Sequence, residues 1–195
     1  MYSSQNDIIG VLQAIYPDSR TVFRLIDVAM LTGETDFQSL NRSLNYFVRS
    51  GKLASPRKGI YAKPVFSYEE VANIICTPSY ISLQYVLQRE GVIFQYRSGI
   101  TSVSYLSRTI KVGGSELSYR KIKDTVLVNT TGLLQKDNKI NIATPERAFL
   151  DLLYLEGEFW FDNLNILNRN KVMKILPIYE SKALTRRVIK LMKND

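Results

Sequence analysis

Amide and guanidinium side chains recur along one face of a predicted helix. This helix begins after Thr35 or Asp36 and ends at Gly51, and its polar face comprises Gln38, Asn41, Arg42, Asn45 and Arg49. Asn and Gln can form paired hydrogen bonds with adenine, and Arg with guanine, when a helix lies in the major groove. The expected chemistry is therefore hydrogen bonding to base edges.

A cationic hairpin is predicted directly after this helix. Two short runs of alternating polarity, at residues 52–55 and 60–62, flank a Pro-Arg-Lys-Gly turn that carries Arg57 and Lys58. The region from Arg42 to Lys63 contains six basic residues and no acid. Cations on such a tip can contact a phosphate backbone or enter the minor groove. We expect Arg57, Lys58 and Lys63 to contact DNA.

The residues before this helix are predicted to form the elements that pack against it. Apolar residues at helical spacing predict a helix that Pro17 stops, with Ile8, Ile9, Leu12 and Ile15 inward. After an extended segment at residues 21–24, a second helix is predicted from Leu25 to its terminator Gly33, with its apolar side chains, Leu31 included, inward. The apolar stripe of the third helix comprises Phe37, Leu40, Leu44, Phe47 and Val48. This order of elements predicts a winged helix-turn-helix over residues 1–64. The alternatives are an ordinary solvated face and a winged helix that contacts only protein.

Composition narrows the classes of function. The 195 residues have a formal net charge of +8, which favours polyanionic partners. The chain has no histidine and a single cysteine, Cys76. These absences exclude catalysis by histidine, and they argue against a zinc site or a disulfide framework. We interpret Cys76 as a small buried residue rather than a nucleophile, and we expect no metal and no cofactor.

Residues 65–195 predict a second domain with a mixed α/β fold. A capping box at Ser67–Glu70 opens one helix, and Thr77 or Ser79 is expected to cap another that ends at Gly91. Alternating segments between residues 99 and 132, with a turn at Gly113-Gly114, predict an antiparallel sheet. A later helix is capped by Thr144, and the last helical region is interrupted at Pro177. The predicted fold class is α+β.

Charge is segregated toward the end of the chain. Residues 146–162 hold five acids against Arg147 alone, whereas residues 169–193 hold eight cations against Glu180. One interpretation is two ordinary solvated helix faces. The other is a second surface for DNA or for an acidic partner, formed by Arg186, Arg187 and Lys190.

Enzymatic motifs are not found in the second domain. Metal-dependent nucleases commonly need a Glu-x-Lys triplet, but Glu116 is followed by Leu117 and Ser118. Gly113-Gly114-Ser115 lacks the lysine of a phosphate-binding loop. We therefore expect no enzymatic activity. No signal peptide or membrane-spanning run is predicted, so a cytoplasmic protein without membrane contact is expected.

Three stretches of the second domain carry a resemblance to a known family. They are "PSYISLQYVLQREGVI" from Pro78, "ITSVSYLSRTIKVGGSELSYRKIK" from Ile100 and "IATPERAFLDLLYL" from Ile142. In this order, behind an N-terminal winged helix, they resemble the AbiEi family of antitoxins, from type IV toxin–antitoxin systems linked to abortive infection of phage. The resemblance extends to about Leu155, and the stretch "GVIFQ" departs from the proline-containing continuation typical of the family.

The resemblance implies a function and two partners. The winged helix would bind inverted repeats in the promoter and repress its own operon, as two side-by-side monomers or as a dimer on DNA. The second domain would oppose a toxin resembling a nucleotidyltransferase, without necessarily forming a stable complex with it. Two other functions stay open: a ligand-responsive transcriptional regulator, and a DNA-modifying or DNA-cleaving enzyme.

Overall fold

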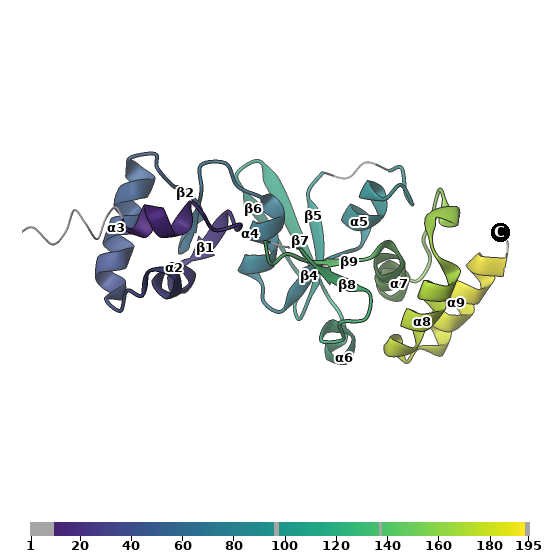
Figure 1. The fold of residues 1–195 in the computed structure, drawn as a ribbon. Coiled ribbons are helices and arrows are strands. Elements are labelled where there is room, and N and C mark those ends of the chain that lie inside the picture. Colours follow the sequence, from purple (N-terminus) through teal and green to yellow (C-terminus); the bar gives the residue numbers. More distant parts are fainter. Residues whose placement is uncertain (1–9, 96–97, 137, 194–195) are drawn as a thin grey trace, which may run out of the picture. The chain divides into compact units, whose positions relative to one another are not determined.

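Residues near the N-terminus form four helical segments and a small sheet. Residues 10–15 are helical and are followed by β1 (Val22–Arg24), α2 (Leu25–Thr32), α3 (Phe37–Arg49), β2 (Ala54–Arg57), β3 (Ile60–Ala62) and α4 (Tyr68–Ile75). The sheet order is β1-β3-β2, with antiparallel neighbours. Figure 1 labels α2, α3, α4, β1 and β2. The computed structural model describes residues 10–95, 98–136 and 138–193, so Ile8 and Ile9 of the predicted first helix lie outside the described residues.

The core of this region follows the predicted helical stripes. Its buried members are Val11, Ile15, Phe23, Val28, Ala29, Leu40, Leu44, Phe47, Leu53 and Tyr61. Gly33, in the left-handed conformation with φ 72°, ends α2 as predicted. Leu31 and Phe37 were expected to point inward, but their side chains are 37% and 45% exposed. Both residues lie at a helix end, where the stripe no longer faces the core.

The chain divides into two compact units, Met1–Ile74 with Asp137–Lys139, and Ile75–Lys136 with Ile140–Asp195. The division predicted from the sequence lies at Pro64, whereas α4 belongs mostly to the first unit. Glu70 of α4 explains this, because its Oε2 accepts hydrogen bonds from the backbone N–H groups of Thr21 (2.6 Å) and Val22 (2.9 Å). The predicted capping box is therefore incomplete: Ser67 Oγ accepts from the Glu70 N–H, but the Glu70 carboxylate is used elsewhere.

The second unit contains a six-stranded mixed sheet in the order β6-β7-β5-β4-β9-β8. Its strands are β4 (Ser79–Ile81), β5 (Ile100–Ser104), β6 (Arg108–Val112), β7 (Ser115–Lys121), β8 (Leu133–Gln135) and β9 (Asn141–Ala143). The β6–β7 hairpin turns at Gly113-Gly114, as predicted. The sheet is not wholly antiparallel, because β5 pairs with β7, and β4 with β9, in parallel.

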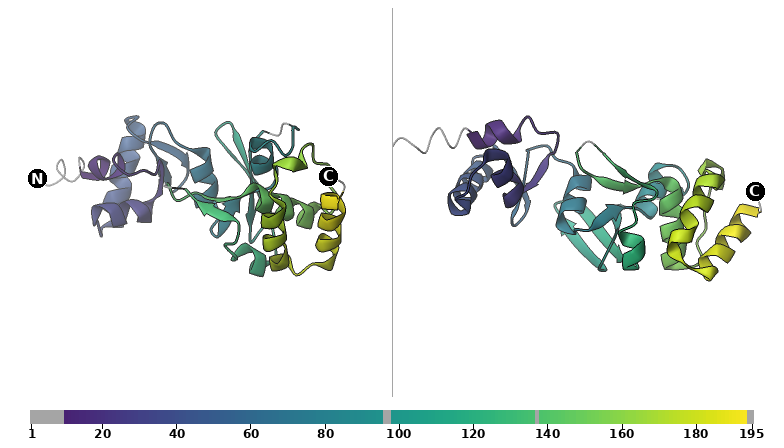
Figure 2. Two further views of the ribbon diagram at one scale, coloured as in Figure 1. Left: turned by 45° about the vertical axis from the view of Figure 1, so that its right-hand side comes forward. Right: turned by 60° about the horizontal axis from the view of Figure 1, so that its bottom comes forward.

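Helices accompany this sheet. They are α5 (Gln84–Arg89), α6 (Asp124–Leu127), α7 (Pro145–Glu156), α8 (Arg169–Ile175) and α9 (Lys182–Lys193), with short 3₁₀ turns at Leu164–Ile166 and Leu176–Tyr179. Within this unit, α7 lies between the sheet and the α8–α9 pair (Figures 1 and 2). The chain is thus α+β. None of the helices in the described ranges has the length and apolar character needed to cross a membrane.

Two predicted elements of the second unit were wrong. Residues 79–81 were expected in a helix but form β4, because their backbone pairs with β5 on one side and with β9 on the other. Residues 124–127 were expected in a strand but form α6, where the consecutive residues Val126 and Leu127 are both buried. The N–H groups of Leu127 and Val128 donate to the carbonyls of Lys123 and Asp124, four residues earlier, so this segment forms a helical turn in place of a strand.

Candidate nucleic-acid interface

The orientation of α3 is fixed at its start and along its buried side. The Asp36 carboxylate accepts hydrogen bonds from the N–H groups of Gln38 (2.9 Å) and Ser39 (3.0 Å), which caps the helix as the sequence predicted. Leu40, Leu44 and Phe47 are at most 2% exposed. Because this stripe is held in the core, the opposite side of the helix must face outward.

The five predicted residues of α3 share this outward side. Gln38, Asn41, Arg42, Asn45 and Arg49 are all exposed. Arg42, Asn45 and Arg49, together with Val48, line a shallow surface depression. A surface that carries amide and guanidinium groups can donate to and accept from base edges, and it can neutralise phosphates.

The side chain of Asn41 on this surface takes part in a hydrogen bond within the first unit. The Tyr61 hydroxyl, from β3, donates to the Asn41 side-chain oxygen at 2.6 Å. Burial raises the pKa of Tyr61, so its phenol remains protonated and acts as the donor at neutral pH. The amide nitrogen of Asn41 therefore remains for an outside acceptor, while its oxygen ties α3 to the small sheet.

The β2–β3 hairpin presents its cations in two different settings. Lys58 is exposed at the turn, and Arg57 beside it is half-buried. The Ser55 hydroxyl lies 3.2 Å from the Arg57 carbonyl and 3.1 Å from the Ile60 carbonyl, so it can donate to either across the turn. The tip therefore has a defined conformation that holds Lys58 outward.

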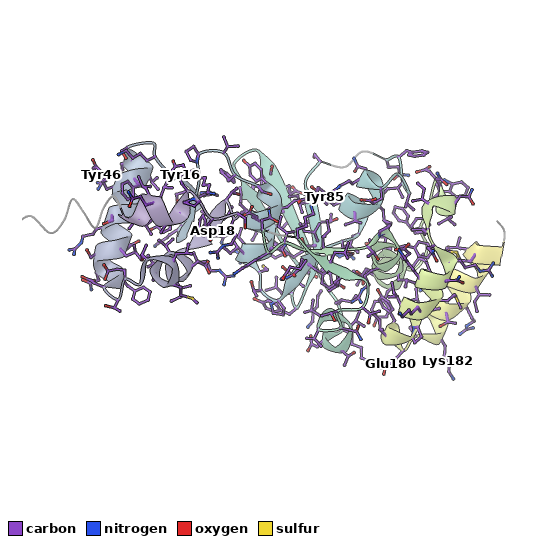
Figure 3. All side chains as sticks on the ribbon, viewed as in Figure 1. Tyr16, Asp18, Tyr46, Tyr85, Glu180 and Lys182 are labelled. Atoms are coloured by element: carbon purple, nitrogen blue, oxygen red, sulfur yellow. The ribbon has the colours of Figure 1, made fainter. Side chains whose placement is uncertain are left out.

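Lys63 has partners within the unit. Its ammonium group donates to the carbonyl oxygens of Tyr16 (3.1 Å) and Asp18 (2.6 Å). The Tyr16 hydroxyl in turn donates to the Lys52 carbonyl at 2.8 Å, and Figure 3 labels Tyr16 and Asp18 in this region. Lys63 was predicted to contact DNA together with Arg57 and Lys58. Its ammonium group instead stabilises the turn that follows the first helix.

The carboxylate of Asp18, whose backbone carbonyl accepts from Lys63, forms an ion pair with Arg20. Its carboxylate accepts two hydrogen bonds from the Arg20 guanidinium, at 3.0 and 2.7 Å. Bonding to Arg20 lowers the pKa of Asp18 despite partial burial, and the same bond raises the pKa of Arg20. The nearby charge of Lys63 also contributes to lowering the pKa of Asp18.

Tyr46 is exposed on α3 but is not among the residues that the sequence predicts to bind DNA. It lies on α3 next to Asn45, is 50% exposed, and packs edge-on against the buried Phe47 with ring centroids 5.8 Å apart (labelled in Figure 3). Its hydroxyl can donate to a phosphate. The signal was available in the sequence, because Tyr46 follows Asn45 at a position that the apolar stripe leaves out.

The second predicted basic surface lies on α9 of the other unit. Arg186 and Lys190 are exposed, while Arg187 is half-buried beside Gly157. The sequences of α8 and α9 contain no acid. Among the described acids, Glu180 lies just before α9, and it pairs with Lys123 at 2.6 Å.

The acidic segment at residues 146–162 was interpreted as a solvated helix face. Two of its charged residues are instead fully buried. Arg147 and Asp151 of α7 are both 0% exposed and pair at 3.3 Å. Arg147 also donates to the backbone carbonyls of Val126, Asn129 and Thr131 and to the Tyr80 hydroxyl. A side chain on Gly132, whose φ is +78°, would meet Arg147 Cβ at 3.0 Å. This close approach requires glycine.

The Asp151 carboxylate is surrounded by donors. It accepts from the hydroxyls of Tyr179 (2.6 Å), Ser82 (2.8 Å) and Tyr80 (3.1 Å). Burial raises the pKa of Asp151, and the ion pair with Arg147 and these hydroxyls oppose that effect. The network joins β4, α7 and the turn before α9, and with neither charge accessible to solvent its role is structural.

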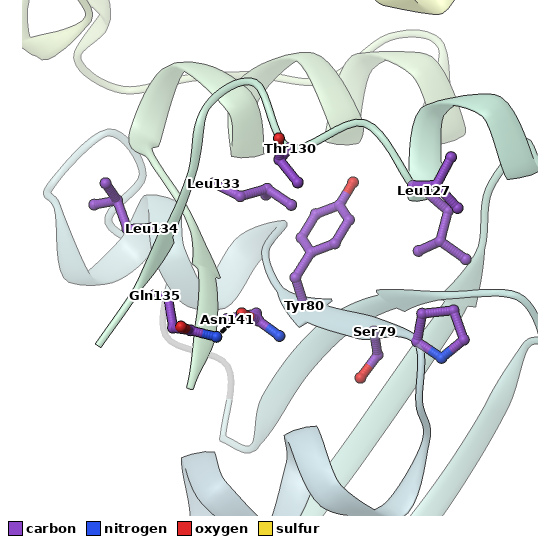
Figure 4. Close-up of a pocket in the computed structure, with 10 residues that line it drawn as sticks. Ser79, Tyr80, Leu127, Thr130, Leu133, Leu134, Gln135 and Asn141 are labelled. Carbon is purple, nitrogen blue, oxygen red and sulfur yellow. Dashed lines mark hydrogen bonds between the residues drawn. The ribbon is translucent and has the colours of Figure 1, made fainter. Parts of the chain in front are cut away.

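One cavity of about 420 Å³ adjoins this network in the second unit. It lies between α6, β4 and the β8–β9 hairpin (Figure 4). Its lining combines apolar side chains with a few polar ones: Pro78, Ser79, Tyr80, Leu127, Val128, Thr130, Leu133, Leu134, Gln135 and Asn141. Such a size and composition can hold a small organic molecule.

Comparison with known proteins shows similarity of fold. No family model and no curated protein matches the chain. A solved structure, that of the RV2827C protein from Mycobacterium tuberculosis, is similar with a TM-score of 0.59 and 12% sequence identity. The similarity covers 96% of this chain and 76% of that one. At this identity the likeness concerns the fold alone.

Proposed function

We propose that the first unit is a winged helix-turn-helix that binds double-stranded DNA. In this proposal α3 lies in the major groove, and the β2–β3 hairpin contacts the neighbouring backbone. One observation carries the proposal. Residues 37–68, which include α3 and the hairpin, contain six cations and no acid. An ordinary solvated face usually mixes both signs of charge.

The base-reading side chains in this proposal are those of Gln38, Arg42 and Asn45. Their side chains are exposed. Asn41 contributes mainly through its amide nitrogen, because its oxygen accepts from Tyr61. Arg49, Arg57 and Lys58 supply charge to phosphates, while Lys63 supports the fold.

We further propose that the protein is an antitoxin that represses its own operon. The support is the resemblance of the second unit to AbiEi antitoxins together with the proposed DNA-binding surface. An inverted repeat in the promoter would be bound by two copies related by two-fold symmetry. The second unit would then neutralise a toxin resembling a nucleotidyltransferase, and no enzymatic step of its own is proposed.

Two assays in cells test this proposal. The full chain is co-expressed with the adjacent gene, while a reporter measures transcription from the chain's own promoter. We expect the wild-type chain to restore growth and to silence the reporter. The full-length Arg42→Ala plus Asn45→Ala variant should lose silencing but still restore growth. A wild-type chain that neither restores growth nor silences the reporter contradicts the proposal.

The cavity in the second unit favours one alternative, a regulator that responds to a small ligand. Its volume of about 420 Å³ lies in the range of ligand sites, and the Tyr80 and Leu133 side chains line it (Figure 4). Under this alternative, a small molecule would change the affinity for promoter DNA, and the adjacent genes would be metabolic. Release of the chain from its promoter by a metabolite, with no growth phenotype, would favour this alternative over the antitoxin.

A further inference from the structure

The tip of the β8–β9 hairpin forms part of the first unit. Residues 137–139 belong to that unit, whereas the two strands of the hairpin belong to the second. A hydrogen bond of 2.9 Å from the Lys136 N–H to the Ile140 carbonyl closes the tip. Lys139 has a φ of +61°, a conformation that a residue other than glycine adopts only where its surroundings require it. The tip therefore presents Asn138, next to Lys139, in a defined position.

Asn138 contacts the buried carboxylate of Glu70. The Asn138 side-chain N–H donates to Glu70 Oε1 at 2.9 Å, although the two residues are 68 positions apart in the sequence. The same oxygen accepts from the Thr21 hydroxyl at 3.0 Å, while Oε2 accepts from the N–H groups of Thr21 and Val22. Glu70 is 5% exposed. A buried carboxylate is stable only where donors replace the water it has lost, so these bonds determine where Glu70 lies.

Thr21 connects this carboxylate to the strands of the first unit. Its carbonyl accepts from the Lys63 N–H at 2.9 Å, just after β3. β1 begins directly after Thr21 and pairs with β3. β3 also pairs with β2, and it holds Tyr61, which donates to Asn41 of α3. The bond from Asn138 is thus one end of a series of contacts that leads to α3.

We propose, on the basis of the DNA binding proposed above, that Asn138 is a positioning residue for the DNA-binding surface. It holds the Glu70 carboxylate against the start of β1, and β1 in turn holds β3 and the hairpin that β3 forms with β2. Asn138 needs no contact with DNA for this role. Because it comes from the later part of the sequence, DNA binding depends on a segment outside residues 1–64, where the winged helix-turn-helix was predicted.

A negative charge at position 138 gives the sharpest test. Asn138→Asp keeps the shape of the side chain but sets a second carboxylate against Glu70. Because two like charges this close repel, we expect the full-length variant to bind promoter DNA roughly tenfold more weakly than the wild type. Asn170→Asp adds the same charge at an exposed position on α8 and should change the affinity less than about twofold. Gel-shift titrations with promoter DNA measure both affinities.

A second substitution tests whether the loss of affinity acts through Glu70. Glu70→Gln combined with Asn138→Asp exchanges the carboxylate and the amide, so that a donor and an acceptor again face each other. We expect the double variant to bind promoter DNA roughly fivefold more tightly than Asn138→Asp alone. A loss of stability that did not involve Glu70 would not be reversed by this exchange.

Amide hydrogen exchange, followed by NMR on the full chain without DNA, reports the local effect. In Asn138→Asp, the N–H groups of Thr21 and Val22 should exchange with water roughly tenfold faster than in the wild type, because repulsion moves their acceptor away. The N–H of Leu87, which donates to the Leu83 carbonyl in the second unit, should keep its exchange rate. This comparison separates a change at β1 from a change in the whole chain.

Asn138→Ala covers the case in which the charged variant does not fold, which a changed emission of the single tryptophan would reveal. It removes the donor without adding a charge and should bind promoter DNA about threefold more weakly. Wild-type affinity in both variants of Asn138 would overturn the inference, and so would a double variant that binds no better than Asn138→Asp. Equal affinity of the wild type for promoter and scrambled DNA would instead contradict the proposed function. The exchange rates of Thr21 and Val22 would then decide whether Asn138 holds β1, and unchanged rates would overturn that too.

Discussion

The hydroxyl of Tyr61 in β3 donates a 2.6 Å hydrogen bond to the side-chain oxygen of Asn41 in the middle of α3. Tyr61 is 3% exposed, whereas Asn41 lies on the outward side of the helix. The bond thus reaches from the core of the first unit to the surface that we propose binds DNA. It couples the position of the hairpin to that of the helix.

Removing this hydroxyl tests the coupling. Tyr61→Phe keeps the ring but leaves the Asn41 oxygen without this donor, so we expect a loss of about 1 kcal/mol in the free energy of unfolding. Promoter affinity should also fall, since the helix and hairpin are no longer held in one arrangement. Urea denaturation and DNA titration of the full chain measure the two effects. Unchanged promoter affinity in a destabilised variant would confine the bond to a structural role.

The outward residues of α3 should contribute to the sequence specificity of DNA binding. Arg42→Ala or Asn45→Ala should each weaken binding to promoter DNA by roughly 1–3 kcal/mol, and less to scrambled DNA, because a lost base contact matters only where the right base is present. Gel-shift titrations with both DNAs measure the difference. Ser39→Ala, on the same helix, serves as a control. Equal weakening on both DNAs would assign these residues to the phosphate backbone.

The buried Arg147–Asp151 pair should be essential for stability. Arg147→Met removes a guanidinium that donates to three carbonyls and leaves Asp151 buried without its cation, so we expect a loss of roughly 3–5 kcal/mol in the free energy of unfolding. Arg186→Met, at an exposed position on α9, should change it by less than about 0.5 kcal/mol. Urea denaturation followed by circular dichroism distinguishes them. Similar curves for both variants would show that the buried pair contributes nothing.

Asp18 should make the first unit sensitive to acid. Its pKa is lowered from 3.8 in the folded chain by the bond to Arg20, so its contribution to stability is present above that value and disappears as the pH falls through the lowered pKa. Asp18→Asn should therefore be less stable than the wild type at neutral pH, and the difference should shrink in acid. Urea midpoints at several pH values test this. A constant difference down to low pH would exclude ionisation of Asp18 as the cause.

Local signals in the sequence were sufficient to predict the helices and strands around the proposed DNA-binding surface. The stripe of Leu40, Leu44 and Phe47, with Asp36 as a cap, determines which side of α3 faces outward, and both features lie within one helix. The same holds for the turn between β6 and β7 and for the helix capped by Thr144. In each case the interacting residues are close together in the sequence.

Features that depend on distant residues were not predictable. Glu70 bonds to Thr21 and Val22, and Asp151 to Tyr80 and Tyr179, so their burial follows from tertiary packing. A charged residue in a sequence is most often solvated, and nothing local to Arg147 shows that three carbonyls will surround it. The loops that carry Phe94 and Trp160 are likewise far apart in the sequence, and they are joined at Val92 and Asp162 only in the folded chain.

The most direct test of DNA binding by α3 and the hairpin is a titration of the full chain with its own promoter DNA over a series of salt concentrations. We expect tighter binding to the promoter than to scrambled DNA at every salt concentration. For Arg57→Ala plus Lys58→Ala, we expect weaker binding to both DNAs and a salt slope reduced by about one for each lost contact. Equal affinity for the two DNAs would contradict the account. So would a slope for this variant no different from that of the control Lys111→Ala plus Lys121→Ala, which removes two exposed cations from the second unit.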